Sequence, residues 1–339
     1  MKRARVGVVS LIAVVAATTA AGATAWLLLR DTTERFPRAT SPRIPTSSSC
    51  GAPGSDESRS NAGIVWGSSR AMIEAVNVDG SGRRVIAPQL GDEQGDPAWS
   101  RDGRAVAFWA RNSDTVEIHV LWPETRERRV LSSDWSRVPG RQFAYILEPS
   151  WAPGGERLAV SDCWTLVSCT IATVSVSTER WTSLTSPNSF RNDSSPAWSP
   201  DGRTVTFVRQ RIGDWDFGPP VIFMIRSDGS DLRRLVRGRS PSWSPDGRSV
   251  AYFDGDSIYR IGADGQRRTR IIGGLKAPER PVGADGEAPT VRWSPDGRKL
   301  LYTTQAGAKT ELWLMNTDGT HRVRILRDAY IGGADWQPG

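Results

Sequence analysis

The sequence has few of the residues on which metal and redox chemistry depend. It contains 2 His and 3 Cys in 339 residues, so sites built from imidazole or thiolate ligands are at a disadvantage. Tyr and Phe are also scarce, with 5 and 8 copies against 15 Trp. Long helices are disfavoured because 33 Gly and 22 Pro interrupt the chain throughout. What remains, 38% hydrophobic and 24% charged residues, is the composition of a globular protein with short elements.

An uncharged run from Val6 to Leu29 follows three basic residues and ends at Arg30. As a helix this run would be roughly 36 Å long, enough to cross a hydrocarbon core of about 30 Å. We therefore expect residues 1–30 to form a transmembrane signal anchor whose positive end stays in the cytoplasm. The alternative is a signal peptide that is cleaved after Ala25 and leaves a secreted protein.

Residues 31–62 consist mainly of Thr, Ser, Pro, Arg and Gly and contain almost no aliphatic side chains. Such a segment cannot bury a core, and we expect a disordered, flexible linker that acts as a tether. Eight basic and four acidic residues lie in residues 1–62, so only +3 of the net charge of +7 belongs to residues 63–339. We therefore expect no binding of nucleic acid.

A Trp-Ser-Pro-Asp-Gly motif returns through residues 63–339 with small variations, at intervals of 43 to 52 residues. Pro presets the first turn position, and Asp-Gly completes a turn that reverses the chain between two strands. Three further segments with alternating polarity follow each motif, which indicates four strands per repeat. The repeats are anchored by six Trp residues: Trp99, Trp151, Trp198, Trp243, Trp293 and Trp336.

The two ends of the repeat region complement each other. Residues 63–98 contain three strands without the first strand of a repeat, and the Trp336 motif supplies a first strand with nothing after it. Joined, they make one composite blade, and the closed ring has no open sheet edges. The sequence thus predicts an all-β fold over residues 63–339, a six-bladed β-propeller preceded by an N-terminal transmembrane helix and flexible linker.

The motif Trp293-Ser294-Pro295-Asp296-Gly297, together with Met315 to Gly319, resembles the repeat of TolB-type propellers. The same repeat occurs in the propeller domains of prolyl-oligopeptidase-like peptidases. The resemblance spans residues 63–339 and implies the architecture, not an activity. Residues 31–62 are too short and polar for the folded domain that precedes the propeller of TolB, and no segment corresponds to the hydrolase domain of the peptidases.

We find no Gly-x-Ser-x-Gly nucleophile motif and no His or Cys cluster with metal-ligand spacing. We therefore expect no metal and no cofactor, and the sequence favours a binding role while it leaves enzymatic activity open. His119 and His321 fall in different repeats, and structural or solvated roles are favoured for both. Cys163 and Cys169 face each other across a predicted hairpin loop, which favours a disulfide over two free thiols in an exported protein. Cys50 is the odd cysteine, in the tether.

All the long, irregular loops fall on one end of the predicted ring. Aromatic and Arg residues on such loops suit a protein or glycan partner, although the loops could instead only fold over the central channel. The candidate binding residues on these loops are Trp135, Arg137, Arg141, Phe143, Tyr145, Phe190, Arg191, Asp214, Trp215, Asp216, Phe217, Glu279 and Arg280.

Together these features predict a monomeric, extracytoplasmic interaction module that binds an unknown protein or glycan of the cell envelope. We expect a single-pass protein of the cell membrane, held by the N-terminal helix; the alternative is a secreted protein. A second hypothesis is an envelope polysaccharide lyase or glycosidase, with Asp96, Glu148 and Asp335 as its candidate carboxylates. A third is an accessory propeller for a separately encoded peptidase.

Overall fold

In the computed structural model, the structure describes residues 63–112, 115–132, 144–165, 168–213, 217–276, 289–328 and 331–338. These residues belong to one compact unit, Asp56–Gly339, and form only β-strands and their connections. The all-β prediction is therefore confirmed for this part of the chain. The anchor predicted for residues 1–30 and the tether predicted for residues 31–62 lie outside the described residues. Within the described ranges, no helix has the length and hydropathy needed to cross a membrane.

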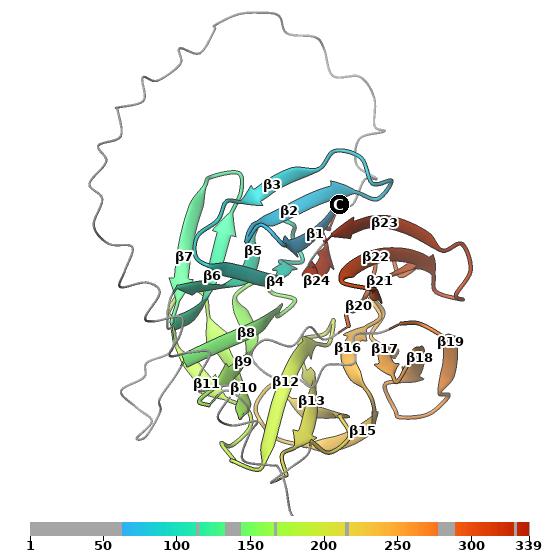
Figure 1. Cartoon of the computed structure of the whole chain (residues 1–339). Coiled ribbons are helices and arrows are strands. Elements are labelled where there is room, and N and C mark those ends of the chain that lie inside the picture. Colours follow the sequence, from blue (N-terminus) through green and yellow to red (C-terminus); the bar gives the residue numbers. More distant parts are fainter. Residues whose placement is uncertain are drawn as a thin grey trace, which may run out of the picture. The chain divides into compact units, whose positions relative to one another are not determined.

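The strands are short and follow one another as antiparallel meanders around a common centre (Figure 1). Their bounds are β1 (Gly63–Ser68), β2 (Ile73–Asn77), β3 (Arg84–Ala87), β4 (Glu93–Trp99), β5 (Val106–Asn112), β6 (Thr115–Trp122), β7 (Glu127–Leu131), β8 (Ala144–Trp151), β9 (Arg157–Cys163), β10 (Cys169–Ser175), β11 (Trp181–Ser183), β12 (Arg191–Trp198), β13 (Thr204–Arg211), β14 (Val221–Arg226), β15 (Arg233–Arg237), β16 (Arg239–Trp243), β17 (Ser249–Asp254), β18 (Ser257–Gly262), β19 (Thr269–Ile272), β20 (Val291–Trp293), β21 (Lys299–Ala306), β22 (Lys309–Asn316), β23 (Val323–Asp328) and β24 (Ile331–Trp336).

The last strand closes the first sheet. Strand β24 pairs antiparallel with β1, from Ile64 opposite Trp336 to Ser68 opposite Ile331, and the sheet order is β24-β1-β2-β3. The predicted composite blade is therefore confirmed. A strand pairing between the two ends of the repeat region ties the ring shut without a covalent bond.

The described strands form five hydrogen-bonded sheets rather than six separate ones. Four sheets contain four strands each, and one contains eight. In the eight-stranded sheet, the meanders β4–β7 and β8–β11 are joined where Thr115 and Val116 of β6 pair in parallel with Ala144 and Tyr145 of β8. This short contact forms because the start of β6 and the start of β8 lie side by side, which repeat spacing alone does not predict.

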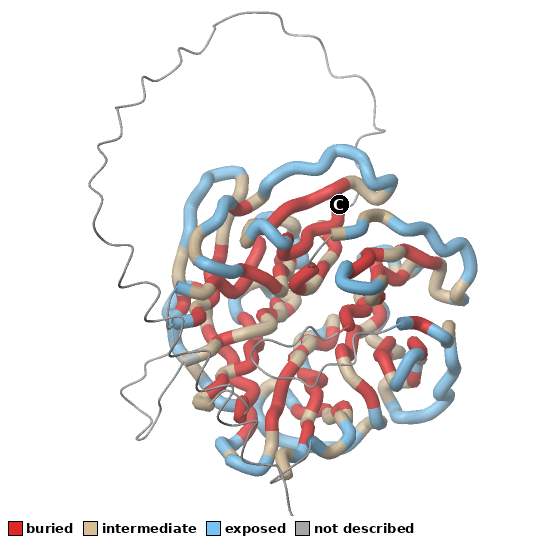
Figure 2. The backbone as a smooth tube through the Cα atoms, in the orientation of Figure 1, coloured by how far each residue is buried: buried red, intermediate tan, exposed pale blue. Residues whose placement is uncertain are grey.

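The core lies between successive sheets, as Figure 2 shows by the buried segments at the inside of the unit. One cluster packs Ile64 and Trp66 of β1 against Leu301 of β21 and Leu312 of β22. Neighbouring sheets cover the faces of each sheet, so middle strands such as β5 and β10 are buried along most of their length. The outermost strands, such as β3 and β15, are exposed and rich in Arg, whose charge discourages pairing with other chains.

A disulfide joins Cys163 at the end of β9 to Cys169 at the start of β10. The two residues are direct partners in the antiparallel register. The predicted disulfide is therefore confirmed, and Cys50 lies outside the described residues.

Ring closure generates a first prediction. Trp336 is 4% exposed, and packs in the cluster that joins the last repeat to the first. Replacing it with Ala removes a large buried side chain, so Trp336→Ala should lower the free energy of unfolding by about 3–5 kcal/mol. Urea unfolding of the purified chain measures the loss. Trp181→Ala, on the half-buried outer strand β11, is the matched control and should cost less than half as much. If both variants lost the same free energy of unfolding, Trp336 would stabilise the fold no more than a Trp on an outer strand does.

Candidate functional site

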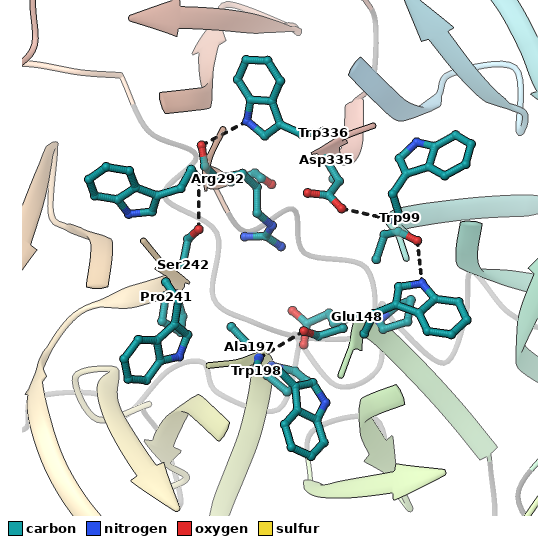
Figure 3. Close-up of a pocket in the computed structure, with 18 of the residues that line it drawn as sticks. Trp99, Glu148, Ala197, Trp198, Pro241, Ser242, Arg292, Asp335 and Trp336 are labelled. Carbon is teal, nitrogen blue, oxygen red and sulfur yellow. Dashed lines mark hydrogen bonds between the residues drawn. The ribbon is translucent and has the colours of Figure 1, made fainter. Parts of the chain in front are cut away.

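The inner strands of the ring surround a central pocket of about 460 Å³ (Figure 3). Strands β4, β8, β12, β16, β20 and β24 all contribute, and each ends at a repeat Trp. The proline residues of the turns that follow these strands also line the pocket, at one end of it. In the described part of the chain, the pocket is therefore built from the repeat motif itself and the residues just before it.

Four inner strands carry a bulge that directs side chains toward the pocket. The register shifts in β4, β8, β12 and β16, and the residue at each bulge has a left-handed backbone, with φ of 45° at Asp96, 54° at Glu148, 52° at Ser195 and 52° at Ser240. Pro follows each of them, and it fits there because a bulge leaves an amide out of the ladder. Each left-handed residue costs on the order of 1 kcal/mol, which the surrounding ring must offset.

Gly333 occupies the corresponding place in β24, with φ of 71°. A Cβ at this position would lie 2.4 Å from Oδ1 of Asp96 in the neighbouring inner strand. Glycine is thus required where the last inner strand approaches the first, both for its backbone conformation and for space.

Every repeat Trp donates a hydrogen bond to the preceding repeat, in two alternating ways (Figure 3). The backbone N–H groups of three of them bond to side-chain oxygens: Trp99 to Asp335 at 2.9 Å, Trp198 to Ser150 at 3.3 Å and Trp293 to Ser242 at 3.1 Å. The indole N–H groups of the other three bond to Ala98 O at 3.0 Å (Trp151), Thr206 Oγ1 at 3.1 Å (Trp243) and Arg292 O at 3.4 Å (Trp336). A short polar side chain just before the preceding Trp decides which form is used.

The turn after four of the six repeat Trp residues is held by its own serine and aspartate. Ser199 Oγ donates to Oδ1 of Asp201 at 2.6 Å, and Asp201 Oδ1 also accepts the backbone N–H of Arg203. The same contacts recur at Ser100, Ser244 and Ser294. The serine hydrogen bond lowers the pKa of Asp201. These aspartates therefore form turns, as the sequence predicted, and point away from any shared ligand.

The pocket wall carries three carboxyl groups, and each accepts at least one structural hydrogen bond. Glu148 accepts the hydroxyls of Ser161 at 2.7 Å and Ser195 at 2.9 Å, together with the backbone N–H of Ser195. Asp96 accepts the indole N–H of Trp109 at 2.8 Å. Asp335 accepts the backbone N–H of Trp99. All three candidate carboxylates of the enzyme hypothesis therefore line one pocket, but each also holds the ring together.

Arg292 lies beside Asp335 on the same wall. Burial raises the pKa of the Asp335 carboxyl, and the charge of Arg292 and the backbone N–H of Trp99 oppose that rise only in part. Arg101 stands where most copies of the motif have Pro, and its Nη1 reaches the carbonyl of Pro200, two repeats along, at 3.1 Å. The pocket is therefore flanked by two guanidinium groups, one on the wall and one at the mouth.

Most of the loop residues predicted to bind a partner lie outside the described residues. These are Trp135, Arg137, Arg141, Phe143, Asp214, Trp215, Asp216, Glu279 and Arg280. Tyr145 and Arg191, which the sequence analysis assigned to loops, belong instead to strands β8 and β12. The loop assignment of these two was wrong because the inner strands continue past their bulges toward the far end of the ring.

Phe190 and Phe217 are exposed and lie on neighbouring segments. Their side chains are 68% and 36% exposed. The carbonyl of Phe190 accepts the N–H of Ile212, and Ile212 forms a β-bridge with Phe217. The two segments, which extend the pairing of β12 with β13, are thus joined at one place.

Sequence reasoning missed Arg292 and Arg101 as pocket residues. The available signal was their departure from the repeat, because the positions that match Arg292 hold Ala, Ser or Asp, and those that match Arg101 hold mostly Pro. In the described ranges, no group of three or more His, Cys, Asp or Glu side chains is arranged to hold a metal ion.

Comparison with known proteins agrees with this geometry. The sequence model of the TolB beta propeller domain, PD40, matches residues 67–338. TolB from Acinetobacter baumannii is 18% identical with a TM-score of 0.63, over 82% of this chain and 67% of that one. A putative TolB from Agrobacterium tumefaciens is 20% identical with a TM-score of 0.57, over 79% and 89%. Oligogalacturonate lyase in complex with manganese is 15% identical with a TM-score of 0.51, over 76% and 70%. At these identities the solved structures share the fold alone.

His119 is a buried histidine outside the pocket. It lies in β6, is 3% exposed and stacks on Phe108 with ring centroids 5.6 Å apart. Burial, with a smaller contribution from the charge of Arg128, lowers the pKa of His119 to about 4. His321 lies instead in the turn between β22 and β23, where Asn316 contacts its Nδ1 at 3.0 Å. Both positions fit the structural roles that the sequence favoured.

The lowered pKa of His119 predicts a stability that depends on pH. The unfolded chain binds the proton below about pH 6.5 and the folded chain only near pH 4, so stability falls as pH drops through this window. At pH 5, the loss caused by His119 should be on the order of 2 kcal/mol relative to pH 7.5. Urea unfolding of the wild type and His119→Leu at the two pH values measures it, with His321→Leu as the control that keeps the wild-type dependence. Parallel pH profiles for wild type and His119→Leu would contradict the assignment.

Proposed function

Because this chain belongs to the TolB beta propeller family, we propose that it is an interaction module of the cell envelope, and that it binds a protein or glycan partner. The proposal includes a ring of six blades over residues 63–339. In this count the eight-stranded sheet holds two blades, β4–β7 and β8–β11, and each remaining sheet holds one. Each of the six units then begins at an inner strand that ends in a repeat Trp.

The observation that carries this function is the exposed aromatic pair of Phe190 and Phe217. Exposed aromatic side chains cost free energy in water and are enriched at interfaces. The segments that bear them are hydrogen-bonded to each other through Ile212, so the pair is presented on a shaped surface.

An envelope polysaccharide lyase or glycosidase is the second candidate function. The presence of Asp96, Glu148 and Asp335 in one pocket favours it. The three hydrogen bonds to Glu148 and the bond from Trp109 to Asp96 weigh against it, because a catalytic acid or base needs a side chain that is free to exchange protons with a substrate. We therefore rank binding above catalysis.

We further propose that residues 1–30 hold the protein in the membrane and that residues 31–62 tether an extracytoplasmic ring to it. The uncharged run from Val6 to Leu29 and the basic residues before it support this arrangement.

Affinity capture tests the binding surface. The immobilised full-length chain should retain at least one envelope component that the double variant Phe190→Ser/Phe217→Ser loses by tenfold or more. The matched control is Val85→Ser/Val323→Ser, which removes two other exposed apolar side chains, 51% and 56% exposed, from the outer strands. The control should retain the component. Identical captured material from wild type and the phenylalanine variant would mean that these loops are not the binding surface.

Membrane fractionation tests the anchor. The full-length chain should stay in the membrane pellet after alkaline carbonate extraction, and protease added to the outside of spheroplasts should digest it. Release by carbonate, or protection from the protease in intact spheroplasts, would refute the single-pass arrangement. A mature protein that begins near Trp26 in the medium would establish secretion instead.

A further inference from the structure

Arg292 places a charged group with unused hydrogen-bond donors on the wall of the central pocket. It stands next to Trp293 in β20, and its guanidinium points into the pocket in Figure 3. Within the described part of the chain, its side chain makes one hydrogen bond, from Nη1 to the carbonyl of Val291 at 3.0 Å. A guanidinium has five N–H donors, so most of those of Arg292 face the cavity.

The acidic side chains around the pocket are hydrogen-bonded to groups other than Arg292. None of the described carboxylates forms an ion pair with Arg292. Glu148 accepts hydrogen bonds from Ser161 and Ser195, and Asp335 accepts one from the backbone N–H of Trp99. The wall therefore presents a fork of donors that suits a planar anion, and a carboxylate fits that fork with two parallel hydrogen bonds.

Proline rings form the aliphatic part of the lining, beside Ser and Thr side chains. Pyrrolidine rings of the turns surround the end of the pocket: Pro153, Pro200, Pro245, Pro295 and Pro338. The indoles of Trp99, Trp198 and Trp336 offer little open surface, because they are 6%, 6% and 4% exposed. An aliphatic body finds contact with the proline rings.

We propose that the central pocket binds an aliphatic carboxylate, whose carboxylate pairs with Arg292 and whose aliphatic body lies against the proline rings. This inference rests on the proposed binding function and names a ligand for a second surface of the same ring. A volume of about 460 Å³ is in the range of small-ligand sites. A free small acid and the carboxyl end of a peptide share this chemistry.

Isothermal titration of the full-length chain tests the proposal with three probes: pentanoate, N-acetyl-alanyl-alanine and the carboxamide of that peptide. At least one of the two carboxylates, pentanoate or the peptide acid, should bind. Where the peptide acid binds, its carboxamide should bind at least tenfold more weakly. Arg292→Gln should weaken carboxylate binding by roughly 10- to 100-fold, the effect of losing a hydrogen bond to a charged group. The tighter of the two carboxylates identifies the source, peptide end or small acid.

Two further variants test whether a loss of carboxylate binding comes from the Arg292 side chain itself, from a change in net charge or from misfolding. Arg104→Gln removes a side chain that is 79% exposed and outside the pocket, and it should leave binding unchanged. Arg292→Lys keeps the charge without the fork and should retain part of the affinity. The backbone carbonyl of Arg292 accepts the Trp336 indole N–H, and side-chain substitutions leave this carbonyl in place. We therefore expect all variants to fold, and thermal unfolding checks this.

Three results would overturn carboxylate recognition. They are unchanged binding by Arg292→Gln, equal binding of peptide acid and carboxamide, and no binding of either carboxylate at roughly 10 mM. None of them affects capture through Phe190 and Phe217, so the failure of this inference is distinguishable from the failure of the proposed function.

Discussion

The structure depends on one interaction that is repeated around the ring: each inner strand is hydrogen-bonded to the preceding inner strand or its blade through a tryptophan N–H. Backbone and indole N–H groups alternate in this role, and the last contact, from Trp99 to Asp335, joins the first repeat to the last. No repeat can bury its sheet faces alone, so the stability of each depends on both neighbours. Strand β24 completes the arrangement because it supplies the missing inner strand of the first sheet.

The central pocket is a consequence of this ring. Six inner strands that converge on one axis leave a cavity, and the bulges at Asp96, Glu148, Ser195 and Ser240 direct side chains toward it. The left-handed backbone at these residues is tolerated because neighbouring inner strands bind their side chains, as Glu148 binds Ser195. Side chains that stabilise the ring therefore also form the pocket wall. Arg292 is a wall residue of another kind, because its backbone carbonyl accepts the Trp336 indole while its guanidinium makes one hydrogen bond, to Val291.

Most side chains of the repeat motif stabilise the ring, which explains why the repeats say little about activity. Ser, Pro, Asp and Gly of the motif are occupied in turns, and the repeat Trp residues are buried between sheets. Information about ligands lies where one copy differs from the others, as at Arg101 and Arg292, and in the loops that bear Phe190 and Phe217. Four predicted loop residues lie in the described part of the chain, and two of them, Tyr145 and Arg191, are strand residues.

The sequence by itself determined the strands, the turns, the composite first sheet and the disulfide. Each of these follows from local chemistry or from a pattern along the chain: alternating polarity, the φ values that Pro and Gly favour, and cysteines placed across one hairpin. Only the tertiary structure decided that Asp335 and Arg292 share a wall and that Arg101 reaches Pro200. It also decided that β6 and β8 pair and that Phe190 and Phe217 lie on joined segments. These outcomes depend on distances between residues far apart in sequence, which are fixed when the ring closes and the sheets pack.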